Sequence, residues 1–246
     1  MNPEMRTKSS VKRYYSRLSE DYDNVRFGND KTRFISSLQV QWILRETRGK
    51  RGIFLDVGCG TGRISLPLLR QSSFVVGVDV ERRMVEMLRE TTKESKLWSF
   101  MDCVVADIEH LPFKDETFDI ITSVRVIWHV PDCKNVLQRI TKTIKKGGIL
   151  LMDFPNAIGI WAALSHVSNR NFEVLTQFAT KSTIENIGHE NKLNVCCSGH
   201  VSPILHLVPV GIFGRLKALL EKVELLGKSQ IVGNLFTYYL IRMIRC

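Results

Sequence analysis

Three glycines at every second position follow an acid in the stretch FLDVGCGTGR. The acid is Asp56, and the glycines are Gly58, Gly60 and Gly62. Because glycine has no Cβ, the backbone can turn sharply here and approach a ligand closely. A carboxylate beside such a loop suits a ligand with an ammonium group better than a pyrophosphate. The stretch therefore predicts a binding turn for a molecule that carries positive charge.

Two further acids follow apolar runs in the same way. Asp79 comes 19 residues after Gly60, where a carboxylate can accept both hydroxyls of a ribose. Asp107, in VVADI, can accept a hydrogen bond from an exocyclic amine, with Ile108 packing on a flat base. The three acids offer partners for an amino acid, a ribose and an adenine, which are the parts of S-adenosylmethionine. The alternative for each acid is a helix N-cap or a surface carboxylate.

A dinucleotide site is disfavoured by the same loop. Nicotinamide and flavin folds use G-x-G-x-x-G, and the third glycine of that pattern is replaced here by Arg63.

Short apolar runs alternate with longer amphipathic ones along the chain. The runs are nearly continuous in hydrophobicity and predict strands buried on both faces, at 52–57, 73–80, 102–108, 118–124 and 148–153. Apolar residues at three- and four-residue spacing predict helices between them, at 63–71, 81–96 and 133–145. Strand, helix and strand in repetition predict an α/β fold with a doubly wound, mostly parallel sheet.

Both ends of the chain add elements to this core. We expect helices at 11–18, 31–44, 182–190 and 213–226, and strands at 193–198 and 235–244. We expect one domain over 1–246: a helical N-terminal lid (1–49), a cofactor-binding core (50–155), and a substrate cover with C-terminal strands (156–246).

Composition limits the class of protein. With 246 residues, 44% of them hydrophobic, the chain is long enough for one large core. The longest uncharged run, 193–214, contains Pro203 and Pro209, which argue against a membrane-spanning helix. The six cysteines show no C-x-x-C pair, and the start of the chain does not resemble a signal peptide. These features favour reduced thiols and a cytoplasmic protein.

The net charge of +10 is concentrated at the two ends. Residues 1–51 carry a net charge of +6 and residues 211–246 a net charge of +4. Such ends could face an anionic substrate, a lipid surface or RNA. The alternative is that they form solvated helix faces.

The motifs resemble those of class I S-adenosylmethionine-dependent methyltransferases that act on small molecules, of the type 11-like kind. LDVGCGTGR resembles the first motif of that family and VVGVDVERRM the second. ADIEHLPFKDETFDIITSVRVIWHVPD resembles the third and fourth motifs, and IKKGGILLM the turn into the fifth strand. The resemblance runs from about residue 50 to 155. It implies a seven-stranded Rossmann-like methyltransferase fold and S-adenosyl-L-methionine as the cofactor.

The resemblance also implies a set of cofactor-binding residues. The methionine end would be lined by Asp56, Gly58, Cys59, Gly60, Thr61 and Gly62, the ribose by Asp79 and Val80, and the adenine by Asp107, Ile108 and Met84. Ser123 would lie near the sulfonium, and Tyr22, in the lid-like segment YYSRLSEDYDN, near the cofactor.

His129 is the candidate catalytic residue. The sulfonium makes the methyl group an electrophile, so the protein must align a nucleophile in line with it, at about 3 Å, and exclude water. His129 follows the fourth expected strand and could act as a base for a hydroxyl or carbon acceptor. The alternative is a packed, hydrogen-bonded histidine.

No metal site is expected. Cys196, Cys197, His200 and His206 lie near one another in the sequence. However, adjacent residues of a strand point to opposite faces, so both thiols cannot easily reach one ion.

The acceptor stays open at this point. The chain has Ser123-Val124-Arg125-Val126 where base-methylating enzymes carry an Asn/Asp-Pro-Pro-aromatic tetrad, so DNA is not expected and RNA is disfavoured. The segments 154–169 and 203–217 supply apolar and basic surface for a substrate cover. They favour a lipid-like, isoprenoid or anionic small molecule, with peripheral membrane contact. The alternatives are an RNA-modifying methyltransferase and a cofactor-binding inactive partner subunit, and the oligomeric state is undetermined.

Overall fold

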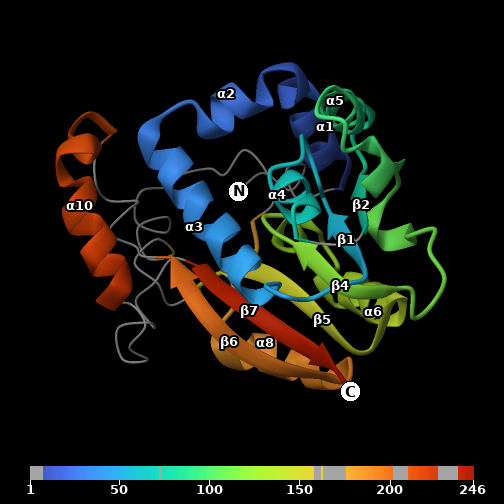
Figure 1. Cartoon of the computed structure of the whole chain (residues 1–246). Helices are drawn as coiled ribbons and strands as arrows, with labels where there is room; N and C mark the ends of the chain where they lie inside the picture. Colours follow the sequence, from blue (N-terminus) through green and yellow to red (C-terminus); the bar gives the residue numbers. More distant parts are fainter. Residues whose placement is uncertain (1–7, 72–73, 158–161, 163–175, 202–209, 227–237) are drawn as a thin grey trace.

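A single mixed sheet organises the computed structural model, which describes residues 8–71, 74–157, 162, 176–201, 210–226 and 238–246. Among these residues, seven strands lie in the order β3-β2-β1-β4-β5-β7-β6 (Figure 1). Their bounds are β1 Ile53–Val57, β2 Phe74–Asp79, β3 Met101–Val105, β4 Phe118–Ser123, β5 Ile144–Pro155, β6 Leu193–Val201 and β7 Tyr238–Arg245.

The first five strands run parallel, as the apolar runs predicted. β1 pairs with both β2 and β4, so that Leu55 lies between Val76 and Ile121. β7 is antiparallel to both of its neighbours, β5 and β6. The strand order reverses direction between β1 and β4, and ligands of doubly wound sheets bind beyond the carboxyl ends of the strands at such a point.

Helices cover both faces of the sheet. The α-helices are α1 Lys8–Leu18, α2 Tyr22–Phe27, α3 Asp30–Glu46, α4 Ser65–Leu69, α5 Arg82–Glu94, α6 Cys133–Thr143, α8 Lys181–Glu190 and α10 Val210–Leu226. Figure 1 shows α3 and α4 on one side of the sheet and α6 and α8 on the other. For α4, which connects β1 to β2, and α6, which connects β4 to β5, the opposite sides follow from right-handed crossovers that proceed in opposite directions along the sheet.

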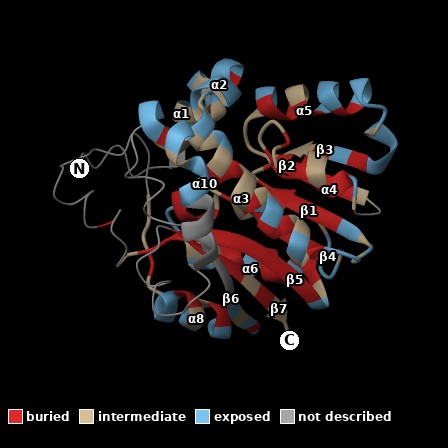
Figure 2. Cartoon of the chain, turned by 60° about the vertical axis from the view of Figure 1, so that its left-hand side comes forward, coloured by how far each residue is buried: buried red, intermediate tan, exposed pale blue. Residues whose placement is uncertain are grey.

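Local sequence explains where several helices begin. Asn29 caps α3 by accepting a hydrogen bond from the Thr32 backbone N–H at 2.9 Å. Asp132 caps α6 in the same way, through Asn135. Each cap satisfies a backbone donor that the first turn leaves unpaired. Figure 2 shows the resulting division, with buried residues along the strands and exposed residues on the outer sides of the helices.

Several predicted boundaries in the core differ from the structure: the strand expected at 102–108, for example, is Met101–Val105. The helix expected at 63–71 is only Ser65–Leu69, because Pro67 has no N–H to donate to the preceding turn. The strand expected at 148–153 already begins at Ile144, where the helix before it has ended at Thr143. Ile144 pairs with Phe118, and Lys145 reaches Asp119 at 2.9 Å. The polar stretch 145–148 hid this extension from an analysis based on apolar runs.

The C-terminal additions agree with the predicted pattern where they are described. The helix expected at 182–190 is α8, and the strands expected at 193–198 and 235–244 correspond to β6 and β7, with 235–237 outside the described residues. Residues 158–161, 163–175 and 202–209 of the predicted substrate cover also lie outside them. Within the described part of the chain, no helix combines the length and apolarity needed to cross a bilayer.

Ile121, at the centre of β4, is fully buried, so Ile121→Ala should destabilise the fold by about 2–5 kcal/mol through lost burial and the cavity left behind. Urea unfolding followed by circular dichroism measures the change. Ile53→Ala is the matched control on β1, since Ile53 is 38% exposed and should cost much less. Equal costs for the two variants would contradict the position of β4 in the core.

Candidate functional site

A cavity of about 560 Å³ lies where β1, β2, β3 and β4 end. Its volume is in the range of binding sites for small ligands. The strand ends, α1 and the segment after β4 contribute the lining: Ser9, Val11, Lys12, Tyr15, Tyr22, Val57, Gly58, Gly60, Val78, Asp79, Val80, Met84, Ala106, Asp107, Ile108, Val124, Arg125, Val126, His129, Val130 and Pro131. The cavity therefore lies at the edge of the sheet that the glycine-rich loop predicted.

The glycine-rich loop is held against β2 and against the segment after β4. The backbone N–H groups of Gly58 and Cys59 both donate to the Val78 carbonyl, at 2.7 and 3.0 Å. Gly58 has a φ of 70°, and a Cβ added there would lie 2.1 Å from the Val126 side chain. Both observations require glycine at 58, because a side chain would be strained and would separate the two segments.

Asp79 anchors the same loop from the end of β2. Its carboxylate accepts hydrogen bonds from the backbone N–H groups of Gly60 and Glu81, each at 2.9 Å. Burial raises the pKa of Asp79, and these hydrogen bonds oppose that increase. Since Asp79 also lines the cavity, its remaining lone pairs are available to a ligand.

Asp56 is only 2% exposed, and its side chain is absent from the cavity lining. Its carboxylate accepts hydrogen bonds from Ser65 Oγ at 2.5 Å and Thr122 Oγ1 at 2.8 Å. Burial raises the pKa of Asp56 to about 6. Asp56 therefore joins β1 to α4 and β4 in this structure.

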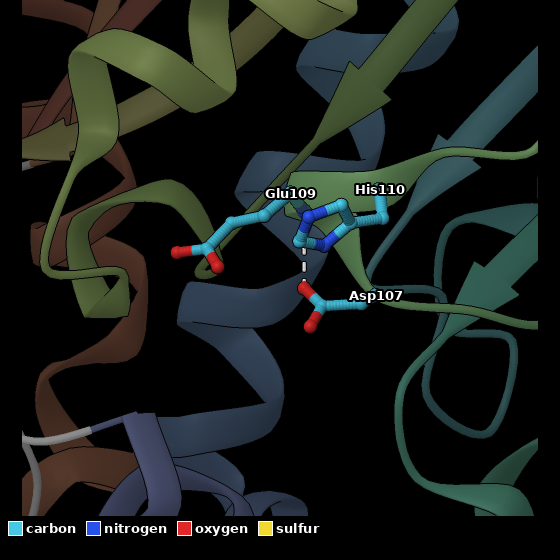
Figure 3. A group of neighbouring side chains, drawn as sticks. All are labelled: Asp107, Glu109 and His110. Atoms are coloured by element: carbon cyan, nitrogen blue, oxygen red, sulfur yellow. Dashed lines mark hydrogen bonds between the residues drawn. The ribbon is translucent and has the colours of Figure 1, made fainter.

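Asp107 lies in the lining just after β3, beside Ile108. It also caps the short helix η4, Ile108–His110, by accepting from the Glu109 N–H at 3.0 Å. Figure 3 shows Asp107, Glu109 and His110 together, and one ligand atom from each lies within 4.8 Å of the others. Exposed acidic groups commonly occur without a metal, so this grouping alone assigns none.

His129 and two tyrosines line the part of the cavity beyond the glycine-rich loop. His129 is 7% exposed, with the Tyr15 ring edge-on at 5.9 Å and the Trp128 ring at 3.9 Å between centroids. The ring centroids of Tyr22 and Tyr15 lie 6.2 Å apart. Burial raises the pKa of Tyr15, so its phenol keeps its proton at neutral pH.

The structure thus brings together most, but not all, of the predicted site residues. Those in the lining are Gly58, Gly60, Asp79, Val80, Met84, Asp107, Ile108, Tyr22 and His129. Those outside it are Asp56, Cys59, Thr61, Gly62 and Ser123. Thr61 donates to Asp23 at 2.8 Å, and Gly62 packs against the side chains of Leu66 and Leu88. Cys59 and Ser123 are buried.

Several lining residues carry functional groups that the sequence analysis did not select. These are Lys12 and Tyr15 on α1, and Arg125 after β4. Tyr15 stands in the segment that resembles a lid, so that segment was the available signal. For Arg125 the signal was its place directly after the fourth apolar run, at the same edge as the acids.

A doubly wound sheet with a glycine-rich turn after β1 and an acid ending β2 defines a class of proteins that bind a nucleoside-containing cofactor at the strand ends. Comparisons with known proteins identify the family within this class. Residues 55–152 match the family described as "Methyltransferase domain". Together with the relatives below, this match shows that the chain belongs to the class I S-adenosylmethionine-dependent methyltransferases.

Two relatives illustrate the similarity. The chain is 29% identical over 142 residues to a ubiquinone biosynthesis O-methyltransferase of Coxiella burnetii, covering 58% of this chain and 60% of the relative. It is 30% identical over 154 residues to a phosphatidylethanolamine N-methyltransferase of Cereibacter sphaeroides, covering 62% of this chain and 75% of the relative.

A solved structure confirms the fold. Magnesium protoporphyrin IX methyltransferase from Synechocystis, with bound S-adenosylhomocysteine, superposes with a TM-score of 0.69 over 98% of this chain and all of that one. The sequence identity is 15%, so this likeness concerns the fold alone.

Asp56 gives a pH-dependent prediction. Its pKa is about 6 in the folded state and 3.8 ordinarily, so the folded state binds this proton more tightly. Its contribution to the free energy of unfolding is therefore largest below pH 4 and is lost as the pH rises through 6. Relative to Asp56→Asn, which cannot titrate, the wild type should lose about 3 kcal/mol between pH 3 and pH 7. Urea unfolding at several pH values measures this difference, and a constant difference would contradict the shifted pKa.

Proposed function

We propose that the protein transfers a methyl group from S-adenosylmethionine to a small-molecule acceptor. One observation carries the proposal: a single cavity is lined by Gly58, Gly60 and Asp79, which suit the cofactor, and by His129 and Tyr15, which can contact an acceptor. Membership of the methyltransferase family supports S-adenosylmethionine as the cofactor.

The cofactor would lie across the ends of β1, β2 and β3. Asp79 would accept hydrogen bonds from the ribose hydroxyls, since its carboxylate lines the cavity while backbone N–H groups hold it in position. Asp107 would accept from the adenine amine, and Ile108 and Met84 offer apolar surface to the ring. In this assignment Asp56 supports the loop from behind.

The acceptor would lie beyond the loop, next to His129. Its nucleophilic atom attacks the methyl carbon in line, the carbon–sulfur bond breaks, and the bonding electrons remain on sulfur. If the nucleophile is a hydroxyl, His129 is the base we propose for its proton. Tyr15 keeps its own proton and therefore serves as a hydrogen-bond donor.

The acceptor we favour is lipid-like, isoprenoid or anionic. The relatives named for phosphatidylethanolamine and for ubiquinone biosynthesis support an apolar acceptor. Val210, Ile212 and Leu219 of α10 are exposed, and Arg215 and Lys217 lie on the same helix. Such a helix supports peripheral contact with an anionic membrane.

Asp79→Ala should weaken S-adenosylhomocysteine binding at least tenfold, because the ribose hydroxyls lose their acceptor and the Gly60 N–H loses its partner. Isothermal titration calorimetry measures the affinity. Asp102→Ala, at an exposed acid of β3, is the matched control and should bind normally. Unchanged affinity in Asp79→Ala would contradict the ribose assignment.

His129→Ala should lower turnover by about a hundredfold or more if the histidine is the base, with cofactor affinity kept. The measurement is mass spectrometry of a cell extract incubated with enzyme and methyl-deuterated S-adenosylmethionine, which also identifies the acceptor. His189→Ala, at an exposed histidine of α8, is the control. If His129→Ala transfers the deuterated methyl group as fast as the wild type, His129 has only a packing role. Cofactor binding without any labelled product from the wild type would support the inactive-subunit alternative.

A further inference from the structure

Arg125 has an unusual backbone and a fixed position. It follows β4 with a φ of 63°, in the left-handed region that side chains other than glycine rarely adopt. Its backbone N–H donates to Asp153 Oδ1 at 2.7 Å, and the Asp153 side chain is fully buried in β5. The left-handed backbone conformation costs about 1–3 kcal/mol at a residue other than glycine, so contacts with the surrounding structure must maintain it. The result is that the side chain of Arg125 lines the cavity.

The guanidinium of Arg125 has no hydrogen-bond acceptor among the described residues. It makes no ion pair with them, and its Nε is buried without a partner. The Phe27 ring centroid lies 5.9 Å from its Cζ, and the buried Asp153 carboxylate is close enough for its charge to attract the guanidinium. A guanidinium carries five N–H donors in a planar fork that matches a carboxylate or a phosphate. Within the described part of the chain, no acceptor oxygen is supplied to it, so the guanidinium can donate to the oxygens of a ligand.

Positive charge gathers around Arg125. Arg63 lies over the same Phe27 ring at 5.6 Å, and Arg26 lies over the Tyr15 ring at 5.8 Å. Burial, and next the charge of Arg125, lower the pKa of Arg63 to about 10. Arg63 and Arg125 therefore raise each other's energy, and an anion between them would lower it.

The buried carboxylate of this region already has its partners. Asp153 accepts from Arg125 N and Trp128 Nε1 through one oxygen, at 2.7 and 3.2 Å, and from Gln39 Nε2 through the other, at 2.9 Å. Its negative charge offsets part of the field of Arg125 and Arg63. None of the hydrogen bonds that Asp153 accepts from the described residues comes from a guanidinium, so its attraction to Arg125 and Arg63 leaves their N–H donors unused by it.

We propose that the methyl acceptor carries an oxyanion, a carboxylate or a phosphate, that binds the Arg125 guanidinium inside the cavity. This inference rests on the proposed function and narrows its acceptor to an anionic class. Lys12, which also lines the cavity, and Arg26 behind Tyr15 add to the attraction. The negative charge of the acceptor would also attract the positively charged sulfonium of the cofactor. Without it, the nearby arginines would repel the sulfonium. Arg125 thereby acts as a specificity residue, distinct from the base.

The test uses the full chain loaded with S-adenosylhomocysteine. The two probes are inorganic phosphate, titrated by phosphorus NMR, and benzoate, titrated by proton NMR. Comparing their affinities separates phosphate recognition from carboxylate recognition. Arg125→Gly removes the guanidinium and suits the left-handed backbone, so it should fold at least as stably as the wild type. We expect it to bind the preferred probe at least tenfold more weakly, with S-adenosylhomocysteine affinity changed less than twofold.

Lys96→Gly is the matched control. Lys96 is an exposed cation after α5 with a φ of 58°, so the same kind of change is made at the same kind of backbone position. This variant should bind both probes like the wild type. Arg125→Lys keeps the charge but loses the fork, and should recover only part of the affinity.

Four results would overturn the inference. If the loaded wild type binds neither probe, the site does not hold an oxyanion. If Arg125→Gly binds the preferred probe as tightly as the wild type does, the guanidinium does not bind the oxyanion. If Arg125→Gly loses S-adenosylhomocysteine affinity tenfold, the guanidinium binds the carboxylate of the cofactor instead. If the wild type does not bind S-adenosylhomocysteine at all, the proposed function itself fails, and this outcome is visible before any probe is added.

Discussion

The close contact between Gly58 and Val126 is the constraint on which the site depends. A Cβ at 58 would lie 2.1 Å from the Val126 side chain, so only glycine allows the loop after β1 to reach the segment after β4. The same loop is tied to the end of β2 by two hydrogen bonds to the Val78 carbonyl. One backbone bend thus joins three strand ends, and the cavity forms between them. Asp79 can hold the Gly60 N–H only because this bend brings the amide to it.

Three acids, on β1, β2 and β5, show how partners decide what a carboxylate does. Asp56 takes two hydroxyl donors, Asp79 takes two backbone N–H groups, and Asp153 takes an amide, an indole and a backbone N–H. Each set offsets the cost of burying a carboxylate. Only Asp79 also lines the cavity. The same residue type therefore supports a loop, contacts the ligand space, or positions Arg125.

Much of the fold was predictable, because strands buried on both faces leave nearly continuous apolar runs. The insertion of β7 between β5 and β6 was not predictable, because the partner of an antiparallel strand leaves no local signal in the sequence. Within the site, strand ends were predictable but side-chain direction was not: Asp56 lies one residue before the end of β1 and faces α4 and β4. Asp153 could have been found by the reasoning used for Asp56, since it is also an acid within a buried run. The place of Arg125 at the sheet edge could be read from the sequence, but its lack of acceptors among the described residues required the three-dimensional structure.

The distribution of charge gives the cavity two unlike ends. Asp79 and Asp107 lie at the ends of β2 and β3, whereas Arg125 and Lys12 lie on the side of β4 and α1. In the proposed function the cofactor sulfonium lies between them, where it is attracted by the acids and repelled by the cations. An anionic acceptor would remove that repulsion, and the sulfonium would in turn favour the anion. Each ligand should then bind more tightly when the other is present, because a coupling free energy between two sites is reciprocal. The cations that disfavour the cofactor alone would thus favour the complex in which methyl transfer takes place.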